Sequence, residues 1–352
     1  MKATINVGLV GFGFASQTFH APLIQATEGL DLVAVSSSDA AKVRASLPNV
    51  EVESQALALC QRSDIDLIVI PTPNDTHFSL AKAALSAGKH VVVDKPFTVT
   101  VSEGKLLKKL ADDKERLLSV FHNRRWDSDF LTVKALLEAG TLGRVVSVES
   151  RFDRFRPQVI DRWREKAAPG GGIWYDLGPH LLDQACELFG MPHAILLEVT
   201  ARRDGAQADD DFLAVLDYES FRVTLSASTL VADPTPRFRI HGTDGSYVKY
   251  GLDPQEERLK AGEVPGAHWG NDTQHGTLTL REGKGESTPL VQREHATLPG
   301  DYLAYYQGIA AAIREQAPLP VSVDDALRSM TLLEAGLDSH RQRRWISLRH
   351  HF

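Results

Sequence analysis

Three ionisable residues lie in sequence settings that could support proton transfer. Lys95, in an Asp-Lys-Pro tripeptide, directly follows the apolar run His90–Val93. Asp176 and His180 are four residues apart, a spacing that places both side chains on one face of a helix. A carboxylate one turn from a histidine can orient the imidazole and raise its basicity. We therefore predict that Lys95, Asp176 and His180 are catalytic: Lys95 or His180 exchanges a proton with a developing alkoxide, and Asp176 orients His180.

Each of these residues also has a purely structural alternative, which the sequence leaves open. A lysine after a strand can be a solvated loop residue, and Asp176 can be the N-cap of a helix that contains a structural His180. Pro179 fits such a helix within its first turn, where a missing N–H costs nothing. The pattern therefore predicts a helix that begins near Asp176.

A glycine-rich loop, Gly11–Ser16, follows the apolar run Ile5–Val10 and precedes a segment compatible with a helix. In a dinucleotide site the first glycine permits a tight turn, the second lets the backbone approach a pyrophosphate, and the helix N-terminus supplies N–H groups. Ser16 replaces the third glycine by another small residue. The loop predicts cofactor contacts, with a plain tight turn as the alternative. The predicted contacts are Gly11, Phe12, Gly13, Phe14 and Ala15.

Two further loops lie where a Rossmann fold puts its chemistry, beyond the carboxyl ends of strands. One begins after the run Leu67–Ile70, and its polar side chains could hydrogen-bond a ribose or a carboxamide, although an ordinary helix-entry turn would look the same. The other contains Lys95, close to the expected position of the nicotinamide. The predicted cofactor contacts from these loops are Pro71, Thr72, Asn74, His77, Asp94, Lys95 and Pro96.

The end of the second strand-like run, Leu32–Val35, bears on the choice of cofactor. A carboxylate there would hold the ribose 2′-hydroxyl of NAD, but the sequence continues Ser-Ser-Ser-Asp, and Asp31 lies at the wrong end of the run. Hydroxyls with Lys42 and Arg44 nearby suit a 2′-phosphate, although the serines could equally cap the next helix. We therefore predict NADP(H) in preference to NAD(H). The residues predicted to select it are Ser37, Ser38 and Lys42.

The elements that must position these residues change in character near residue 123. Up to that point short apolar runs alternate with helical stretches such as Val101–Lys114, which predicts βαβ units and a parallel sheet covered on both faces. Beyond it strand-like segments follow one another on short turns, and helices return at the end. We predict an α/β Rossmann domain over residues 1–122, followed over residues 123–352 by an α+β domain with a large open, mostly antiparallel sheet.

Composition narrows the classes of function. The 352 residues are 43% hydrophobic and 24% charged, as in an average globular protein, and the formal net charge is −7. That charge disfavours nucleic acid or an anionic membrane as the main partner. The two cysteines, Cys60 and Cys186, lie outside any metal or redox motif, and no apolar run is long enough for a bilayer. We expect a cytoplasmic protein without a bound metal.

Taken together, the glycine loop, the Lys-Pro pair and the pattern G-G-G-x-x-x-D-x-G-x-H-x-x-D in residues 170–183 resemble the Gfo/Idh/MocA oxidoreductases. The resemblance spans the chain. It implies reversible hydride transfer between NAD(P)(H) and a secondary alcohol or ketone of a sugar, polyol or related metabolite. It matches Lys95, Asp176 and His180 to the family's catalytic residues, whereas Asp94 replaces the usual glutamate. It also implies a cis lysine–proline bond and a homodimer or higher homo-oligomer.

Two other functions remain open from the sequence. Some members of the family retain the cofactor and oxidise the substrate transiently while cleaving a glycosidic bond, which gives turnover without a net redox change. The second is a non-catalytic dinucleotide or sugar sensor, although a sensor has no need of proton-transfer residues. Which of Lys95 and His180 donates the proton is also open.

An arginine-rich segment precedes the triple glycine and could hold a carboxylate or phosphate group of the substrate. Its acidic neighbours make a solvated surface the alternative. Aromatic residues beside the predicted catalytic helix could stack on a sugar ring or pack in the core, and a histidine lies at the expected domain junction. The predicted substrate contacts are His122, Arg154, Trp163, Trp174 and Tyr175.

Overall fold

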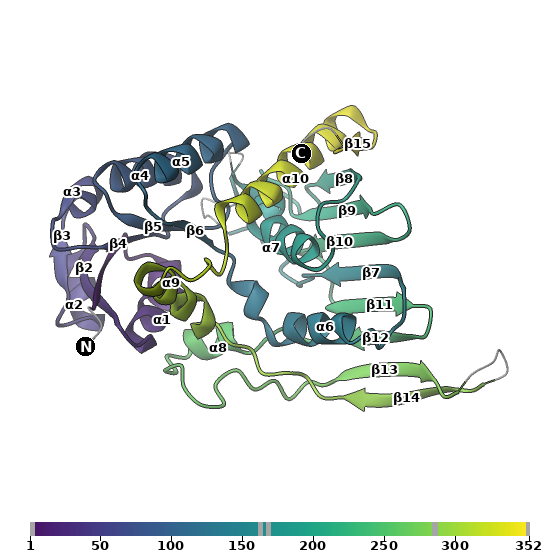
Figure 1. Ribbon diagram of the computed structural model, residues 1–352. Coiled ribbons are helices and arrows are strands. Elements are labelled where there is room, and N and C mark those ends of the chain that lie inside the picture. Colours follow the sequence, from purple (N-terminus) through teal and green to yellow (C-terminus); the bar gives the residue numbers. More distant parts are fainter. Residues whose placement is uncertain (1–3, 161–164, 167–169, 284–287, 350–352) are drawn as a thin grey trace. The chain divides into compact units, whose positions relative to one another are not determined.

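The structure is a computed structural model that describes residues 4–160, 165–166, 170–283 and 288–349 of the 352-residue chain (Figure 1). These residues form two compact units. Unit 1 consists of the chain up to Trp126 together with Pro254–Trp269 and Asp301–Met330. Unit 2 consists of Asp127–Asp253, Gly270–Gly300 and the chain from Thr331 onward. Unit 1 therefore draws on three separate stretches of sequence.

The strands of unit 1 are β1 (Ile5–Val10), β2 (Leu30–Ser36), β3 (Glu51–Glu53), β4 (Leu67–Ile70), β5 (His90–Asp94) and β6 (Leu118–Phe121). Within the described residues they form one six-stranded sheet in the order β3-β2-β1-β4-β5-β6, and all neighbours are parallel. Every residue of β4 and β6 is buried, as expected for strands covered on both faces. The predicted parallel Rossmann sheet is confirmed.

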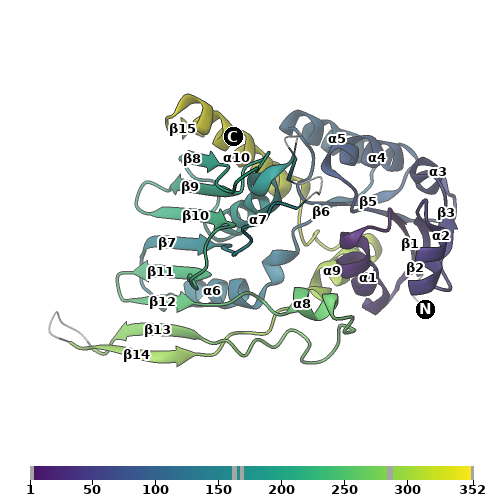
Figure 2. The same cartoon turned by 180° about the vertical axis from the view of Figure 1, so that it is seen from behind.

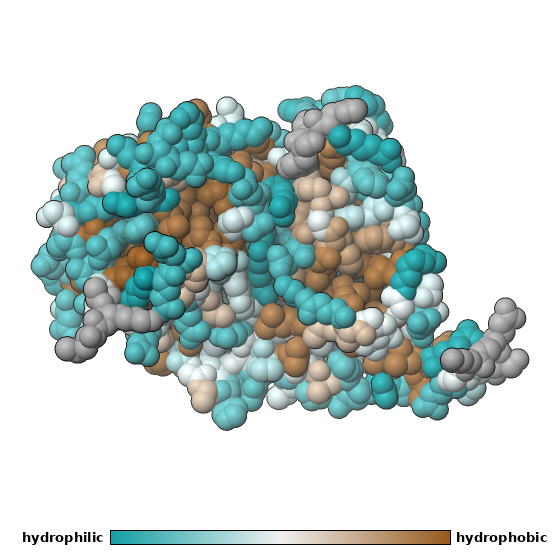
Figure 3. All heavy atoms as spheres, viewed as in Figure 1, coloured by the Kyte–Doolittle hydropathy of each residue, from teal (hydrophilic) through white to brown (hydrophobic). Residues whose placement is uncertain are grey.

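The helices of unit 1 include α1 (Ala21–Ala26), α2 (Ala40–Ser46), α3 (Ala56–Gln61), α4 (Asn74–Ser86), α5 (Val101–Asp113), α8 (Gln255–Lys260) and α9 (Leu303–Glu315). Helices α4 and α5 lie along one face of the sheet, and α1 and α9 lie along the other (Figures 1 and 2). Hydrophilic residues cover the outer surface of α4 and α5 (Figure 3). Tyr305 and Tyr306 of α9 are fully buried and pack against Phe121 of β6. A segment from near the end of the chain thus completes the Rossmann core.

The strands of unit 2 are β7 (Val145–Arg151), β8 (Ala194–Thr200), β9 (Asp211–Asp217), β10 (Arg222–Ser228), β11 (Phe238–Gly242), β12 (Gly245–Lys249), β13 (Gly276–Arg281), β14 (Leu290–His295) and β15 (Ile346–Ser347). The described part of unit 2 forms one nine-stranded sheet in the order β14-β13-β12-β11-β7-β10-β9-β8-β15. Strands β7 and β10 pair in parallel, and the other neighbours are antiparallel. The predicted large, mostly antiparallel sheet is confirmed.

One face of the unit 2 sheet is covered by helices. They are α6 (Ser128–Glu138), α7 (Gly172–Phe189) and the later part of α10 (Val323–Gln342), and Figure 2 shows the face that they leave open. Strand β9 illustrates the alternation, because Phe212, Ala214 and Leu216 are buried whereas Leu213 is 44% exposed. None of the helices in the described residues combines the length and apolar character that a bilayer span requires.

Candidate active site

The carboxyl edge of the unit 1 sheet brings the predicted cofactor loops together. Because β1, β4 and β5 are parallel neighbours, the segments that follow them all leave the sheet at this edge. A Cβ on Gly11, after β1, would lie 3.5 Å from Thr72 Cγ2, after β4. Phe12, Phe14 and Ala15 lie in the same first loop, and Pro71 and Asn74 in the second.

The glycine loop has the backbone geometry that a dinucleotide requires. Gly11 has a φ of +83°, a conformation that favours glycine, and its N–H donates to the Ser36 carbonyl oxygen (3.0 Å). Ser16 is buried, and its Oγ donates to the Gly11 carbonyl oxygen (2.8 Å), so this residue closes the turn in place of the third glycine. A Cβ on Gly13 would meet no protein atom within 4 Å. That space, at the N-terminus of the following helix, fits a pyrophosphate.

The segment after β2 offers a cation to this loop. Lys42 Nζ donates to the Phe12 carbonyl oxygen (3.3 Å), so the ammonium group lies beside the glycine loop. Asp39, rather than a serine, caps α2, because its carboxylate accepts the N–H of Lys42 (2.9 Å). Ser37 Oγ accepts the N–H of Asp39 (3.1 Å), and Ser38 is exposed. Lys42 and Ser38 are therefore accessible to a group bound at the loop.

His77 has a different role from the cofactor contact that the sequence predicts. Its side chain is fully buried in α4, with Nε2 2.8 Å from the Thr72 carbonyl oxygen and Nδ1 3.0 Å from the Pro96 carbonyl oxygen. Burial lowers the pKa of His77 despite the opposing charge of Asp94. Because a neutral imidazole has one N–H, the ring donates to one of these carbonyl oxygens and packs against the other. His77 therefore lies between the loop after β4 and the loop after β5 as a positioning residue rather than as a ribose contact.

Asp94 is the last residue of β5, and Lys95 follows it. Beside Asp94 lies a buried histidine that no sequence motif marks. The Lys95–Pro96 bond is cis, as the family resemblance implies, and Lys95 itself is half-buried. Asp94 Oδ1 accepts the backbone N–H of Lys95 (2.7 Å), and Oδ2 lies 4.0 Å from Nε2 of His20. Burial alone would raise the pKa of Asp94, but its interaction with the nearby His20 and the positive charge of Lys95 outweigh the effect of burial and hold that pKa below its usual range.

His20 is buried in the helix that follows the glycine loop, in a π-helical turn (Ser16–His20). Its Nδ1 lies 2.6 Å from the Tyr306 hydroxyl. This histidine therefore joins Asp94 to α9 of the same unit. A local sequence pattern gives no sign of it, because Tyr306 lies 286 residues away.

In unit 2, the helix that carries Asp176 and His180 begins earlier than the sequence predicts. Helix α7 starts at Gly172, and Pro179 lies inside it. The first backbone N–H groups are satisfied by Asp209, which precedes β9: its carboxylate accepts the N–H of Trp174 (2.8 Å) and its carbonyl oxygen accepts the N–H of Ile173 (2.8 Å). The prediction that the helix begins near Asp176 is wrong, since the capping carboxylate comes from a distant loop.

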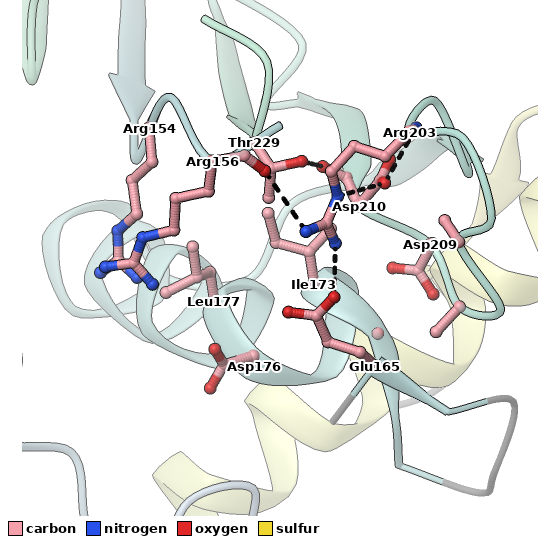
Figure 4. A pocket seen from close by; sticks show the side chains of 13 residues that line it. Arg154, Arg156, Glu165, Ile173, Asp176, Leu177, Arg203, Asp209, Asp210 and Thr229 are labelled. Atoms are coloured by element: carbon pink, nitrogen blue, oxygen red, sulfur yellow. Dashed lines mark hydrogen bonds and ion pairs between the residues drawn. The ribbon is translucent and has the colours of Figure 1, made fainter. Parts of the chain in front are cut away.

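The pocket beside α7 is organised by Arg203 (Figure 4). Its guanidinium is 6% exposed and bonds two buried carboxylates, Asp210 (Nε–Oδ2, 2.8 Å) and Glu165 (Nη2–Oε2, 2.9 Å). Nη1 also donates to the carbonyl oxygens of Arg156 (3.4 Å) and Gln158 (3.1 Å). One side chain therefore fixes the segment after β7 relative to the loop before β9. No local motif in the sequence marks Arg203, Asp209 or Asp210 as site residues.

Asp176 and Arg154 line this pocket, whereas other predicted substrate residues do not fit their expected role. Trp174 is fully buried, packs edge-to-face on Phe212 (centroids 4.9 Å apart) and donates from Nε1 to the Leu333 carbonyl oxygen. The prediction that Trp174 stacks on a sugar is therefore wrong, because its ring belongs to the core.

The remaining predicted substrate and acid–base residues include Tyr175, His122 and His180, whose side chains are buried to different extents. Burial, with a contribution from the charge of Glu334 on α10, raises the pKa of Tyr175. His122, directly after β6 in unit 1, is 2% exposed, and His180 on α7 is 5% exposed. Trp163 lies outside the described residues. The structure thus brings Asp176 and Arg154 to one pocket and Asp94, Lys95, Thr72 and Gly11 to one sheet edge.

A parallel sheet with a glycine loop built for a pyrophosphate, joined to an α+β unit with a carboxylate–histidine helix, defines an NAD(P)-binding oxidoreductase. Residues 5–122 match the family description "Oxidoreductase family, NAD-binding Rossmann fold", and residues 134–348 match "Oxidoreductase family, C-terminal alpha/beta domain". The chain belongs to the Gfo/Idh/MocA family of oxidoreductases.

Close relatives share the whole length of the chain. The uncharacterized oxidoreductase YdgJ of Escherichia coli is 54% identical over 99% of this chain and 100% of its own. The scyllo-inositol 2-dehydrogenase (NADP(+)) IolW of Bacillus subtilis is 39% identical over 99% of this chain and 97% of its own. The solved structure of YPO2259 from Yersinia pestis has a TM-score of 0.94 at 54% identity, and covers 99% of this chain and 98% of its own.

Proposed function

We propose that this chain catalyses the reversible, NADP(H)-dependent oxidation of a secondary hydroxyl on a sugar or cyclic polyol. The observation that carries the proposal is the half-buried Lys95 at the same sheet edge as the glycine loop. The 39% identity to a protein named scyllo-inositol 2-dehydrogenase (NADP(+)) supports both the polyol and the cofactor.

In the proposed mechanism the protein supplies orientation and proton transfer. A dinucleotide held by the loops after β1 and β4 would supply the hydride-transfer chemistry. Lys95 and His180 are the two candidates for taking the proton of the reacting hydroxyl during oxidation. Asp176 orients His180, and Asp94 restrains the backbone of Lys95. His77 and His20 act as positioning residues for the cofactor loops.

The test is turnover of scyllo-inositol and related polyols by Lys95→Ala and His180→Ala variants, followed by the absorbance of the reduced nicotinamide. We expect kcat/KM to fall about 10²–10⁴-fold in each variant while the cofactor still binds. Lys105→Ala, which removes an exposed lysine on α5, is the control and should be unchanged. If neither catalytic variant loses activity, the assignment of the site is wrong.

The same assay separates the two alternative functions. Cleavage of a glycoside without net cofactor reduction would indicate a redox-neutral enzyme. Tight cofactor binding without turnover of any polyol, sugar or hydroxy acid would indicate a sensor. For the cofactor preference, Lys42→Ala should raise KM for NADP⁺ about tenfold and leave KM for NAD⁺ unchanged, because it removes the cation proposed to face the 2′-phosphate.

We also propose that the chain forms homo-oligomers through the open face of the unit 2 sheet. Leu213, 44% exposed in β9, and the partly exposed Val215 place apolar surface on that face. Light scattering should show a dimer or larger species for the unmodified protein and a smaller one for Leu213→Glu. Leu57→Glu, at a 53% exposed leucine of α3 in unit 1, is the matched control. A monomeric unmodified protein would contradict the proposal.

A further inference from the structure

A hollow of about 620 Å³ lies at the amino edge of the unit 1 sheet, the edge opposite to the glycine loop. Residues before β4, β5 and β6 line it, together with the first residues of β1 and the end of α9. This volume is in the range of small-molecule sites. The charged residues of its lining are Asp66, Lys89, Arg116 and Arg314.

Lys89 is buried at this hollow with an unusual set of partners. Lys89 is 8% exposed, and its Nζ donates to the Ile65 carbonyl oxygen (2.7 Å). Lysines this buried are normally paired with a carboxylate. Among the described residues no carboxylate lies within ion-pair distance of Lys89, and nearby Asp64 is bound through both oxygens by Arg62. The hydrogen-bond acceptor of Lys89 Nζ is therefore a neutral carbonyl, and the charge of Lys89 acts on the Asp64 carboxylate only at longer range.

The two arginines are also anchored to backbone carbonyls. Arg116 Nε donates to the Gly88 carbonyl oxygen (2.5 Å), and Arg314 Nη2 donates to the Gly29 carbonyl oxygen (2.6 Å). Arg116 Nη1 also donates to the Glu115 carbonyl oxygen (3.0 Å), so neutral carbonyls orient this guanidinium group. The planar fork of a guanidinium matches the oxygens of a carboxylate or phosphate.

The remaining polar residues add a neutral donor and one carboxylate. His90 Nδ1 accepts the N–H of Leu117 (3.0 Å), and burial, then the charge of Arg116, lowers the pKa of His90. The ring is therefore uncharged at neutral pH and carries its proton on Nε2. Asp66 Oδ2 accepts the N–H of Asn6 (2.9 Å). The lining thus holds three cations and one carboxylate, in a chain whose net charge is −7.

We propose that this hollow binds a small anion that carries phosphate or carboxylate groups. The ligand would accept hydrogen bonds from Lys89 and Arg116 and would compensate the charge of the buried lysine. This site is separate from the cofactor loop, because it lies where the parallel strands begin rather than where they end. The proposal does not depend on the proposed reaction.

The test is isothermal titration calorimetry of inorganic phosphate and, separately, of malonate into the protein saturated with NADP⁺ at constant ionic strength. Saturation with the cofactor keeps the probes away from the glycine loop. We expect at least one probe to bind, and the double variant Lys89→Gln/Arg116→Gln to weaken that probe about tenfold or more. The matched control is Lys82→Gln/Lys105→Gln, which removes the same charge from exposed positions on α4 and α5.

Arg116→Glu is a second variant that guards against misfolding, because Arg116 is exposed and its replacement leaves the buried lysine in place. It should abolish binding of the same probe. Phosphate in preference to malonate would identify a phosphorylated ligand class, and the reverse a carboxylate class. The proposal is overturned if neither probe binds, or if Arg116→Glu and the control variant bind the probe as the unmodified protein does.

Discussion

The two units hold their candidate active-site residues in different ways. In unit 1 the cofactor loops are fixed through backbone groups: Gly11 turns at positive φ, and the buried ring of His77 lies between backbone carbonyls of two loops. In unit 2 the helix with Asp176 depends on buried charges, since Asp209 caps it and Arg203 joins two carboxylates beside it. The two units therefore depend on different kinds of buried side chain: an imidazole at the loops of unit 1, and a guanidinium that supports several segments of unit 2.

Arg203→Met, in unit 2, should cause the largest loss of stability. It leaves Glu165 and Asp210 buried without their counter-charge, so we expect a loss of about 3–5 kcal/mol in the free energy of unfolding and a lower kcat/KM. Urea denaturation of the whole protein measures the free energy of unfolding, and steady-state kinetics measure kcat/KM. The control is the neighbouring Arg202→Met, whose side chain is 52% exposed and should cost less than about 0.5 kcal/mol. Equal losses in both variants would contradict the role of Arg203.

Gly172→Ala tests the cap of α7 and should have the next largest effect. Gly172 has a φ of +86°, and a Cβ there would lie 2.0 Å from Asp209 Oδ1. Asp209 cannot move aside without disturbing its bond to the N–H of Trp174. Gly190→Ala, at the other end of α7, has a φ of +73° but no atom within 4 Å of the new Cβ.

Both alanine variants carry backbone strain, and the clash adds about 1–3 kcal/mol at residue 172 alone. Thermal unfolding should therefore separate Gly172→Ala from Gly190→Ala by several degrees. The Asp209 cap would be unimportant if the two variants unfolded at the same temperature.

Gly13→Ala is the corresponding change in unit 1, and its effect should fall on binding rather than on stability. A Cβ at Gly13 meets no protein atom within 4 Å, so the fold has room for it, but it occupies the space proposed for the pyrophosphate. We expect the Kd for NADP⁺ to rise about tenfold, which is about 1.4 kcal/mol, at an unchanged Tm. Gly266→Ala, another uncrowded loop glycine of unit 1, should change neither quantity. A fall in Tm for Gly13→Ala would mean that this glycine serves the fold.

Features that depend on nearby residues could be predicted from the sequence. The glycine loop and the position of Lys95 depend on residues within a few positions of each other, next to strands that are recognisable from their apolar runs. The parallel sheet and the antiparallel sheet follow from the spacing of those runs. These features were predictable because the chemistry and the backbone that presents it are local.

Other features of the site depend on contacts that only the folded chain creates. Asp209 caps a helix that begins 37 positions earlier (209 − 172), which is why that helix was predicted to start too late. The ring nitrogens of His77 lie next to carbonyl oxygens of two loops, and the ring of Trp174 packs in the core of unit 2. Hydrogen bonds and burial of this kind are set by tertiary packing, so residue type and spacing alone do not reveal them.

The division of unit 1 among three stretches of sequence has a consequence for synthesis on the ribosome. The first 126 residues emerge long before α9, yet Tyr305 and Tyr306 fill the centre of the Rossmann core against Phe121. Until those tyrosines are translated, the nascent unit 1 exposes an apolar surface and a gap where α9 belongs. Unit 1 therefore closes after most of unit 2 has been made, and an expression fragment that ends at the apparent Rossmann boundary would lack part of its own core.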